Sequence, residues 1–179
     1  VIILIIMIHF KSFEQAAIVL LMIPLSLLGA FWGHWLHGKP VSMLSILGMV
    51  ALTGVIVNDA VIFLSKYNNY IASGTKIKEA IIETGKNRLR PIILTTLTTT
   101  IGLYPLILEK SFQAQFLIPM AISLAYGVAF GTLFILIFFP VLIHILNDIR
   151  RLAYGLWNKK SYEPEQVEVA VIYKERHIE

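Results

Sequence analysis

Long apolar segments separated by short charged stretches constrain the fold of this chain more than any other feature. They span residues 1–10, 16–36, 41–64, 91–108 and 116–146. Crossing the hydrocarbon core of a bilayer takes about 20 helical residues. The first segment is therefore too short to cross alone, and we expect it to be the end of a transmembrane helix. The other segments are predicted spans, and the last, roughly 46 Å long as a helix, must tilt, bend or protrude.

These segments predict an all-α fold, a polytopic transmembrane helix bundle. Lipid offers no hydrogen-bond partners, so a spanning segment must be a helix or part of a closed barrel. Barrel strands would appear as segments of about ten residues with alternating polarity, and the segments here do not alternate. Charged residues make up only 15% of the chain, against about 25% in soluble domains. The lipid bilayer is thus the first expected partner.

The distribution of basic residues predicts the orientation in the membrane. They gather in residues 65–90 and in the tail, 147–179, whereas the connections around residues 37–40 and 109–115 carry few charges. The positive-inside rule places the first two regions in the cytoplasm and the other two outside. Because Val1 lies inside an apolar run without a basic leader, we expect the chain to be part of a longer protein.

The cytoplasmic loop, residues 65–90, is predicted to contain an amphipathic helix. Thr75 is the expected N-cap and Gly85 the expected end. This helix either lies along the membrane surface or packs on the helix bundle. Pro91 is expected in the first turn of the next span. The charged tail from Ser161 onwards is expected to lack fixed structure in the membrane part alone.

Several functional classes are excluded by missing motifs. The net charge of +4 arises from residues placed as the positive-inside rule requires, so no nucleic-acid partner is expected. The chain has no cysteine, no Walker A sequence and no hydrolase or zinc-protease motif, which predicts a protein that is not an enzyme and holds no cofactor. His34 and His37 have helical spacing for a metal, but no third ligand is evident, so no metal site is predicted.

Asp59 is the first candidate for chemistry. It lies in the apolar segment 41–64, beside Asn58. A carboxylate inside a spanning helix is costly and must face protein or water, so it is a functional candidate by default. The functional interpretation is a proton-carrying group, and the structural alternative is a carboxylate held by hydrogen bonds. Side chains of successive residues point about 100° apart, so we expect Asn58 and Asp59 not to share one partner.

Five threonines, at positions 95, 96, 98, 99 and 100, follow on the segment that starts at Pro91. Thr95 is a candidate for a hydroxyl-lined path beside Asp59. For the threonine run as a whole, the favoured interpretation is that the hydroxyls bond back to their own helix and pack on neighbours. Arg88 is expected either to anchor the loop at the cytoplasmic interface or to turn inward.

Two pairs of glycines occur at a spacing of four residues. They are Gly29 with Gly33 and Gly127 with Gly131. Small residues at this spacing let transmembrane helices approach closely. We therefore predict a helix-packing role for all four glycines.

Several of these residues belong to longer stretches that resemble one transporter family. The stretches are Gly54–Ile62, Glu79–Ile81, Arg88–Thr96, Gly102–Leu106, and Pro119–Ala121 through Phe139–Val141. The first two resemble the tenth helix and the connecting helix of the resistance–nodulation–division transporters. The next two resemble the eleventh helix of that family, and the last resembles the twelfth. The resemblance covers about residues 1–147 and is strongest to the hydrophobe/amphiphile efflux (acriflavine-resistance) branch, with the heavy-metal branch next.

The resemblance implies the C-terminal transmembrane part of a bacterial inner-membrane pump. Such a pump is a homotrimer with two pseudo-repeated halves and large periplasmic domains, and it works with a periplasmic adaptor and an outer-membrane channel. Protons entering the cell drive the export of drugs or other amphiphiles. The missing N-terminal half of the same protein is then a required partner, and the C-terminus is cytoplasmic.

The resemblance also implies a proton relay. The family's relay lysine, arginine and threonine would fall on Asn58, Arg88 and Thr95. Many drug exporters have lysine at the position of Asn58, so the charge balance of the relay must differ here. Our hypothesis is that Asp59 supplies a titrating group instead. The alternatives are a heavy-metal, lipid or protein-export member of the superfamily, or a non-transporting membrane protein whose polar spans only hold helices together.

Overall fold

The protein folds into long helices packed side by side, and the chain is all-helical as the sequence predicts. The computed structural model describes residues 6–7, 10, 12–158, 168 and 171. Its long helices are α2 (Phe13–His37), α3 (Met43–Ala72), α4 (Ile77–Leu108) and α5 (Phe112–Asn158). All four are long and apolar enough to cross a membrane. In residues 1–10, the predicted end of a helix lies mostly outside the described residues.

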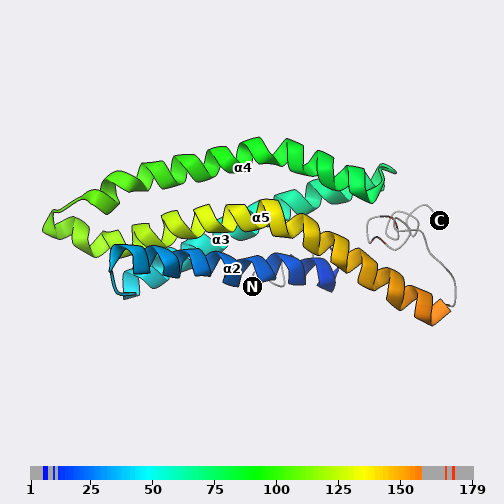
Figure 1. The fold of residues 1–179 in the computed structure, drawn as a ribbon, viewed down its shortest axis with the longest axis horizontal. Coiled ribbons are helices and arrows are strands. Elements are labelled where there is room, and N and C mark those ends of the chain that lie inside the picture. The colour runs from blue at the N-terminus through cyan, green and yellow to red at the C-terminus, as the bar shows by residue number, and fades with distance from the viewer. Residues whose placement is uncertain (1–5, 8–9, 11, 159–167, 169–170, 172–179) are drawn as a thin grey trace.

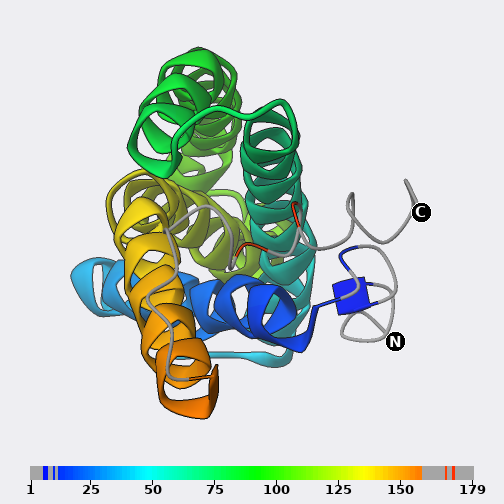
Figure 2. The same cartoon turned by 90° about the vertical axis from the view of Figure 1, so that its right-hand side faces the viewer.

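Helix α5 is the centre of the arrangement, because it packs against each of the other three helices. The end-on view in Figure 2 shows α2 and α4 on opposite sides of the molecule, with α3 and α5 between them. The α2–α3 and α4–α5 connections lie at one end, and the α3–α4 connection lies at the other (Figure 1). The chain therefore runs back and forth along one axis, as successive membrane crossings require.

Side-chain and glycine caps fix the ends of α2 and α3. The Ser12 hydroxyl accepts a hydrogen bond from the Gln15 backbone N–H at the start of α2. Gly38 ends the helix with φ 58°, a left-handed conformation that glycine adopts without a Cβ clash. Helix α3 begins with a capping box formed by Ser42 and Ser45. Both caps satisfy backbone groups at the ends of apolar helices, where unpaired groups are costly.

Helix α4 shows that three expectations were wrong: the N-cap at Thr75, the helix end at Gly85 and the start of a new helix near Pro91. Its N-cap is Lys76, without a side-chain hydrogen bond, and not Thr75. The helix does not end at Gly85 and continues through Pro91 as one element to Leu108. Glycine inside a helix costs only about 1 kcal/mol, and packing on both sides of these residues outweighs the local preferences. The early turns are buried against the bundle at Ile77, Ala80, Ile81 and Thr84.

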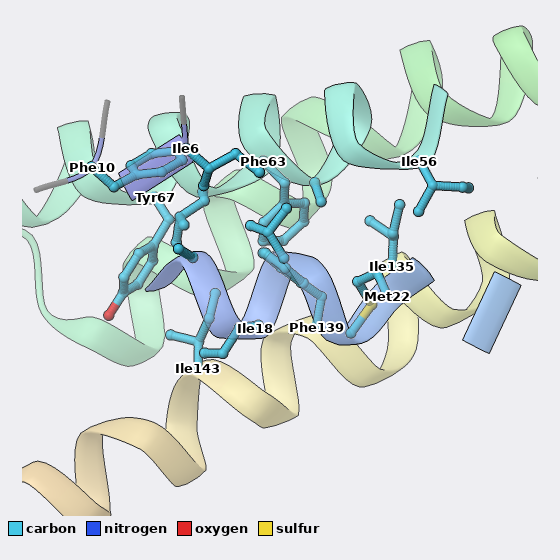
Figure 3. Packing of buried hydrophobic residues seen from close by; sticks show 14 of the residues in the cluster. Ile6, Phe10, Ile18, Met22, Ile56, Phe63, Tyr67, Ile135, Phe139 and Ile143 are labelled. Carbon is cyan, nitrogen blue, oxygen red and sulfur yellow. The ribbon is translucent and has the colours of Figure 1, made fainter. Parts of the chain in front are cut away.

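The apolar core contains residues from all four helices, and its central part lies between α2, α3 and α5. Figure 3 shows Met22, Phe63, Ile135 and Phe139 converging between these helices. The rings of Phe63 and Phe139 meet edge to face, with centroids 5.3 Å apart, a favourable geometry for aromatic pairs. This core holds α3 and α5 together along the middle of the molecule.

Helices α2 and α4 differ sharply in burial. In the most apolar part of α2, 44% of the residues are buried inside the chain, against 11% in α4. Large apolar side chains of α4 are left exposed: Leu89, Leu94, Leu97, Ile101 and Leu108. Of the four spans, α4 therefore buries the smallest share of its apolar part within this chain.

One part of the tail contradicts the expectation of a chain without fixed structure. Glu168 is only 2% exposed. Its carboxylate accepts hydrogen bonds from the Asn147 amide at 2.8 Å and the Arg150 guanidinium at 3.1 Å. Arg150 also pairs with Glu14 of α2. A buried carboxylate needs such partners, and both lie on α5. The rest of residues 159–179, apart from Val171, lies outside the described residues.

Candidate functional site

A pocket of about 190 Å³ lies between α3 and α4, and it gathers the predicted relay residues. Its lining consists of Asn58, Asp59, Ile62, Arg88, Pro91, Ile92 and Thr95. On each helix these residues are spaced by three or four positions, apart from direct neighbours, so they share one face. All four residues predicted for a proton relay thus border one space, although they come from two helices.

Asp59 is the buried acid of this pocket. Only 9% of the surface of Asp59 is exposed. Among the described residues, no hydrogen bond or ion pair is recorded for its carboxylate. The carboxylate of this largely buried residue borders the pocket, and a carboxylate without such partners is costly to keep charged away from water. This side chain therefore does not match the structural alternative of an acid held by hydrogen bonds within this chain.

Arg88 supplies the cationic group of the same pocket. The side chain turns inward from α4 and is half-buried, which corresponds to the second of its two expected placements. Its Nε atom is buried and has no hydrogen-bond partner in the described part of the chain. A guanidinium stays charged at every physiological pH. The pocket therefore combines a fixed positive charge with a carboxyl group that can bind or release a proton.

Thr95 and Asn58 add polar groups on the exposed side of the pocket. The Thr95 hydroxyl donates to the Pro91 carbonyl oxygen at 3.0 Å. Its only hydrogen is used within α4, so the hydroxyl oxygen can act towards the pocket only as an acceptor. Asn58 is exposed in this chain, whereas Asp59 next to it is buried. Both residues border the pocket, and within the described part of the chain they have no hydrogen-bond partner in common.

Sequence reasoning did not single out the apolar part of the lining. Ile92 is 4% exposed, and Ile62 lies one turn beyond Asn58 and Asp59 on α3. Helical spacing from Asp59 and from Arg88 was the available signal for both residues. Their apolar surface borders the same pocket as the polar groups.

The predicted packing glycines lie where helices come closest. We call Gly29, Gly33, Gly127 and Gly131 the glycine seam. A Cβ atom at Gly29 would lie 2.3 Å from the Cβ of Phe130, and one at Gly33 would lie 2.6 Å from the Cγ of Tyr126. The α2 glycines thus face α5.

The α5 glycines of the seam face the other way, towards α3. A Cβ at Gly127 would lie 2.2 Å from Leu52 Cδ2, and one at Gly131 would lie 2.2 Å from Ile56 Cδ1. Gly48 makes a similar approach, with the Met120 carbonyl oxygen 2.6 Å from a Cβ built on it. No small residue stands four positions from Gly48, which is why the spacing rule missed it.

His34 connects two helices and does not take part in a ligand cluster. It is 4% exposed, and its Nε2 atom lies 2.9 Å from the Ser123 hydroxyl of α5. His37 Nε2 lies 3.0 Å from the Tyr126 hydroxyl. No group of three or more His, Cys, Asp or Glu side chains suited to a metal ion occurs within the part of the chain that the structure describes.

Four apolar spans with a charged pocket between two of them define a polytopic α-helical membrane protein. Residues 1–147 match the profile of the AcrB/AcrD/AcrF family. The chain belongs to this family of resistance–nodulation–division efflux transporters. Proteins of this family are transporters and normally not enzymes.

Individual relatives come from different branches. The chain is 33% identical over 90 residues to the swarming motility protein SwrC of Bacillus subtilis, covering 50% of this chain and 9% of the relative. Identity to the cobalt-zinc-cadmium resistance protein CzcA of Cupriavidus metallidurans is 28% over 112 residues, covering 63% and 10%. Identity to the multidrug resistance protein MdtC of Erwinia amylovora is 25% over 143 residues, covering 79% and 14%.

A solved structure shares the fold. The crystal structure of a heavy metal efflux pump, form II, aligns with a TM-score of 0.73 and 26% identity over 82% of this chain and 14% of that one. The chain thus spans about a tenth of the length of the relatives it matches. These similarities establish the family and leave the predicted hydrophobe/amphiphile branch undecided.

Proposed function

We propose that this chain is part of a proton-driven inner-membrane efflux transporter that exchanges protons for drugs or other amphiphiles. Membership in the efflux family supports the transport function. The observation that carries the proposal is the α3–α4 pocket, which is lined by the largely buried Asp59, by Arg88 and by Thr95. A titratable group within a spanning helix, next to a fixed charge, is typical of proton pathways.

In this proposal Asp59 is the group that binds and releases the coupling proton. A proton from the outside converts the carboxylate into a neutral carboxylic acid, and release towards the cytoplasm restores the charge. Arg88 stays positive throughout, so it attracts the carboxylate in one state and loses that attraction in the other. Asn58 cannot carry a proton. Alternation between these two charge states provides the differential interaction that shifts a helix between two positions.

The proposal extends to the surroundings of the chain. The 65–90 region and the tail face the cytoplasm of a bacterial cell, in line with the positive-inside rule. The complete transporter contains the N-terminal half, forms a homotrimer, and works with a periplasmic adaptor and an outer-membrane channel. These partners follow from the family alone.

Export of heavy-metal ions is the second candidate function. One curated relative is named for cobalt, zinc and cadmium resistance, and the aligned crystal structure is of a heavy metal efflux pump. MdtC, the relative aligned over the larger share of this chain, is named for multidrug resistance. Both candidates use the same pocket and differ in the exported substrate. Growth of a pump-deficient host carrying the complete transporter, with dyes and detergents or with cobalt, zinc and cadmium, separates them.

The test of coupling is Asp59→Asn in the complete transporter. Asparagine has nearly the same shape but cannot take up a proton, so efflux and substrate-induced proton movement in inverted vesicles are expected to be lost. The amount of folded transporter in the membrane should be unchanged. Asp59→Glu is the matched variant that keeps a carboxyl group, and it should retain part of the activity. Unchanged efflux by Asp59→Asn would disprove this role of Asp59.

The same variant tests the non-transporting alternative. If Asp59 only supports helix association, Asp59→Asn lowers the amount or the thermal stability of the protein, and no proton movement occurs in the parent either. Proton movement that depends on substrate in the parent contradicts that alternative directly.

A further inference from the structure

Helix α5 contacts the other three helices at two consecutive residues, Gly131 and Thr132. Thr132 is 4% exposed, and its hydroxyl oxygen lies 2.5 Å from the hydroxyl oxygen of Thr96 on α4. The Gly131 backbone lies against Ile56 of α3 and Ser26 of α2. One short stretch of α5 therefore touches all the neighbouring spans.

The direction of the α4–α5 hydrogen bond can be assigned. The Thr96 hydroxyl donates its single hydrogen to the Ile92 carbonyl oxygen at 2.9 Å. A hydroxyl has one donor, so Thr96 must accept and Thr132 must donate in the bond between them. The result is a chain of hydrogen bonds from Thr132 through Thr96 to the backbone at Ile92, a residue of the pocket lining.

The contact between Gly131 and Ile56 of α3 also lies close to the pocket. Ile56, which is fully buried, precedes Asp59 by three residues, so the two lie about one helical turn apart on neighbouring faces. On α4, Thr96 directly follows Thr95. The two contacts of α5 are therefore made within one turn of a lining residue on each wall of the pocket, Asp59 on α3 and Thr95 on α4.

We propose that Gly131 and Thr132 are positioning residues that set the separation of α3 and α4 across the Asp59 pocket. They are not among the residues that line the pocket, and they act through Ile56 and Thr96. Movement of α5 then changes both walls at once and couples the proton site to the rest of the bundle. The effect on transport rests on the function proposed above, whereas the effect on helix separation does not.

Thr132→Val removes the hydroxyl and keeps the branched shape. In the complete transporter, we expect the maximal efflux rate to fall about tenfold, the usual size of coupling through a single contact. The substrate concentration at half-maximal rate should not change, because the proposed role of the pocket is to carry the proton. Thr132→Ser keeps the hydroxyl and should restore the rate. Thr53→Val is the matched control, since the Thr53 hydroxyl donates to Met49 of its own helix.

A second measurement follows the helices directly. Cysteines in place of Ile62 and Ile92, on opposite walls of the pocket, report the α3–α4 distance through the rate of cross-linking by a short bifunctional reagent. The Thr132→Val background should change this rate at least twofold, and the Thr53→Val background should leave it unchanged. If Thr132→Val does not fold, Thr96→Val removes the other end of the same bond and must give the same change.

The outcomes separate the two proposals. Unchanged cross-linking and unchanged efflux in a folded Thr132→Val or Thr96→Val variant overturn the positioning role, whatever Asp59→Asn does. Changed cross-linking, together with full efflux by Asp59→Asn, supports the positioning role and overturns the proton role of Asp59. Failure of Thr132→Ser to restore the efflux rate also contradicts the positioning role, because the bond would then not be the cause.

Discussion

The glycine seam and the Asp59 pocket are built in opposite ways within one bundle. At the seam, backbones approach so closely that a single methyl group would overlap a neighbour. Between α3 and α4, side chains leave a pocket of about 190 Å³, and α4 buries little of its surface within this chain. Close packing resists movement, whereas a polar gap tolerates it. The comparison shows that the α2–α5 and α5–α3 contacts at the seam are tighter than the α3–α4 contact at the pocket.

The largest effect on stability is expected from a substitution in the glycine seam. Gly29→Ala should lower the free energy of unfolding by about 1–3 kcal/mol, because the added methyl group overlaps the Phe130 side chain and the Tyr126 backbone carbonyl. Thermal unfolding of the purified complete transporter measures this loss. Gly85→Ala is the matched control, because a Cβ there meets no atom within 4 Å. Equal melting temperatures for the two variants would show that the seam is not tightly packed.

A smaller loss is expected from the polar contact at the end of the seam. Ser123→Ala removes the hydroxyl partner of the buried His34 Nε2 atom, and an unsatisfied buried polar group costs about 1–3 kcal/mol before water enters. The expected loss is at the lower end of this range, since α2 ends nearby. Thr53→Ala, which removes a hydroxyl bonded within one helix, should change stability by less than about 0.5 kcal/mol. Equal stabilities of Ser123→Ala and Thr53→Ala would contradict the assigned contact.

The smallest effect on stability is expected in the pocket. Thr95→Val removes a hydroxyl that donates within α4, so the free energy of unfolding should change by less than about 0.5 kcal/mol. Transport should nevertheless fall, since the pocket loses an acceptor beside Asp59. Efflux and thermal unfolding are measured on the same preparations, with Thr53→Val as the control. A stability loss as large as that of Gly29→Ala would remove the contrast between seam and pocket.

Much of the candidate site could be anticipated, because it depends on local spacing. Asp59 is conspicuous as an acid within an apolar segment, and the resemblance to the family directed attention to Asn58, Arg88 and Thr95. Helical spacing then places these residues on single faces of two helices. What local spacing could not supply is the bond between Thr96 and Thr132, which are 36 positions apart.

The errors of sequence reasoning also have physical causes. Gly85 and Pro91 are helix breakers by local preference, yet α4 passes through both because its ends are held by packing. The tail was expected to be without fixed structure from its charge alone. Glu168 is buried nonetheless, because Asn147 and Arg150 of α5 provide donors for its carboxylate.

The sequence by itself determined the number of spans, their helical nature and the positions of the polar residues within them. Length, hydrophobicity and the need to satisfy the backbone inside lipid decide these features locally. Only the tertiary structure decided which helix faces meet. Most sides of these spans are apolar, so periodicity does not mark an inner face. Contacts such as that between His34 and Ser123, 89 positions apart, depend on the crossing of whole helices.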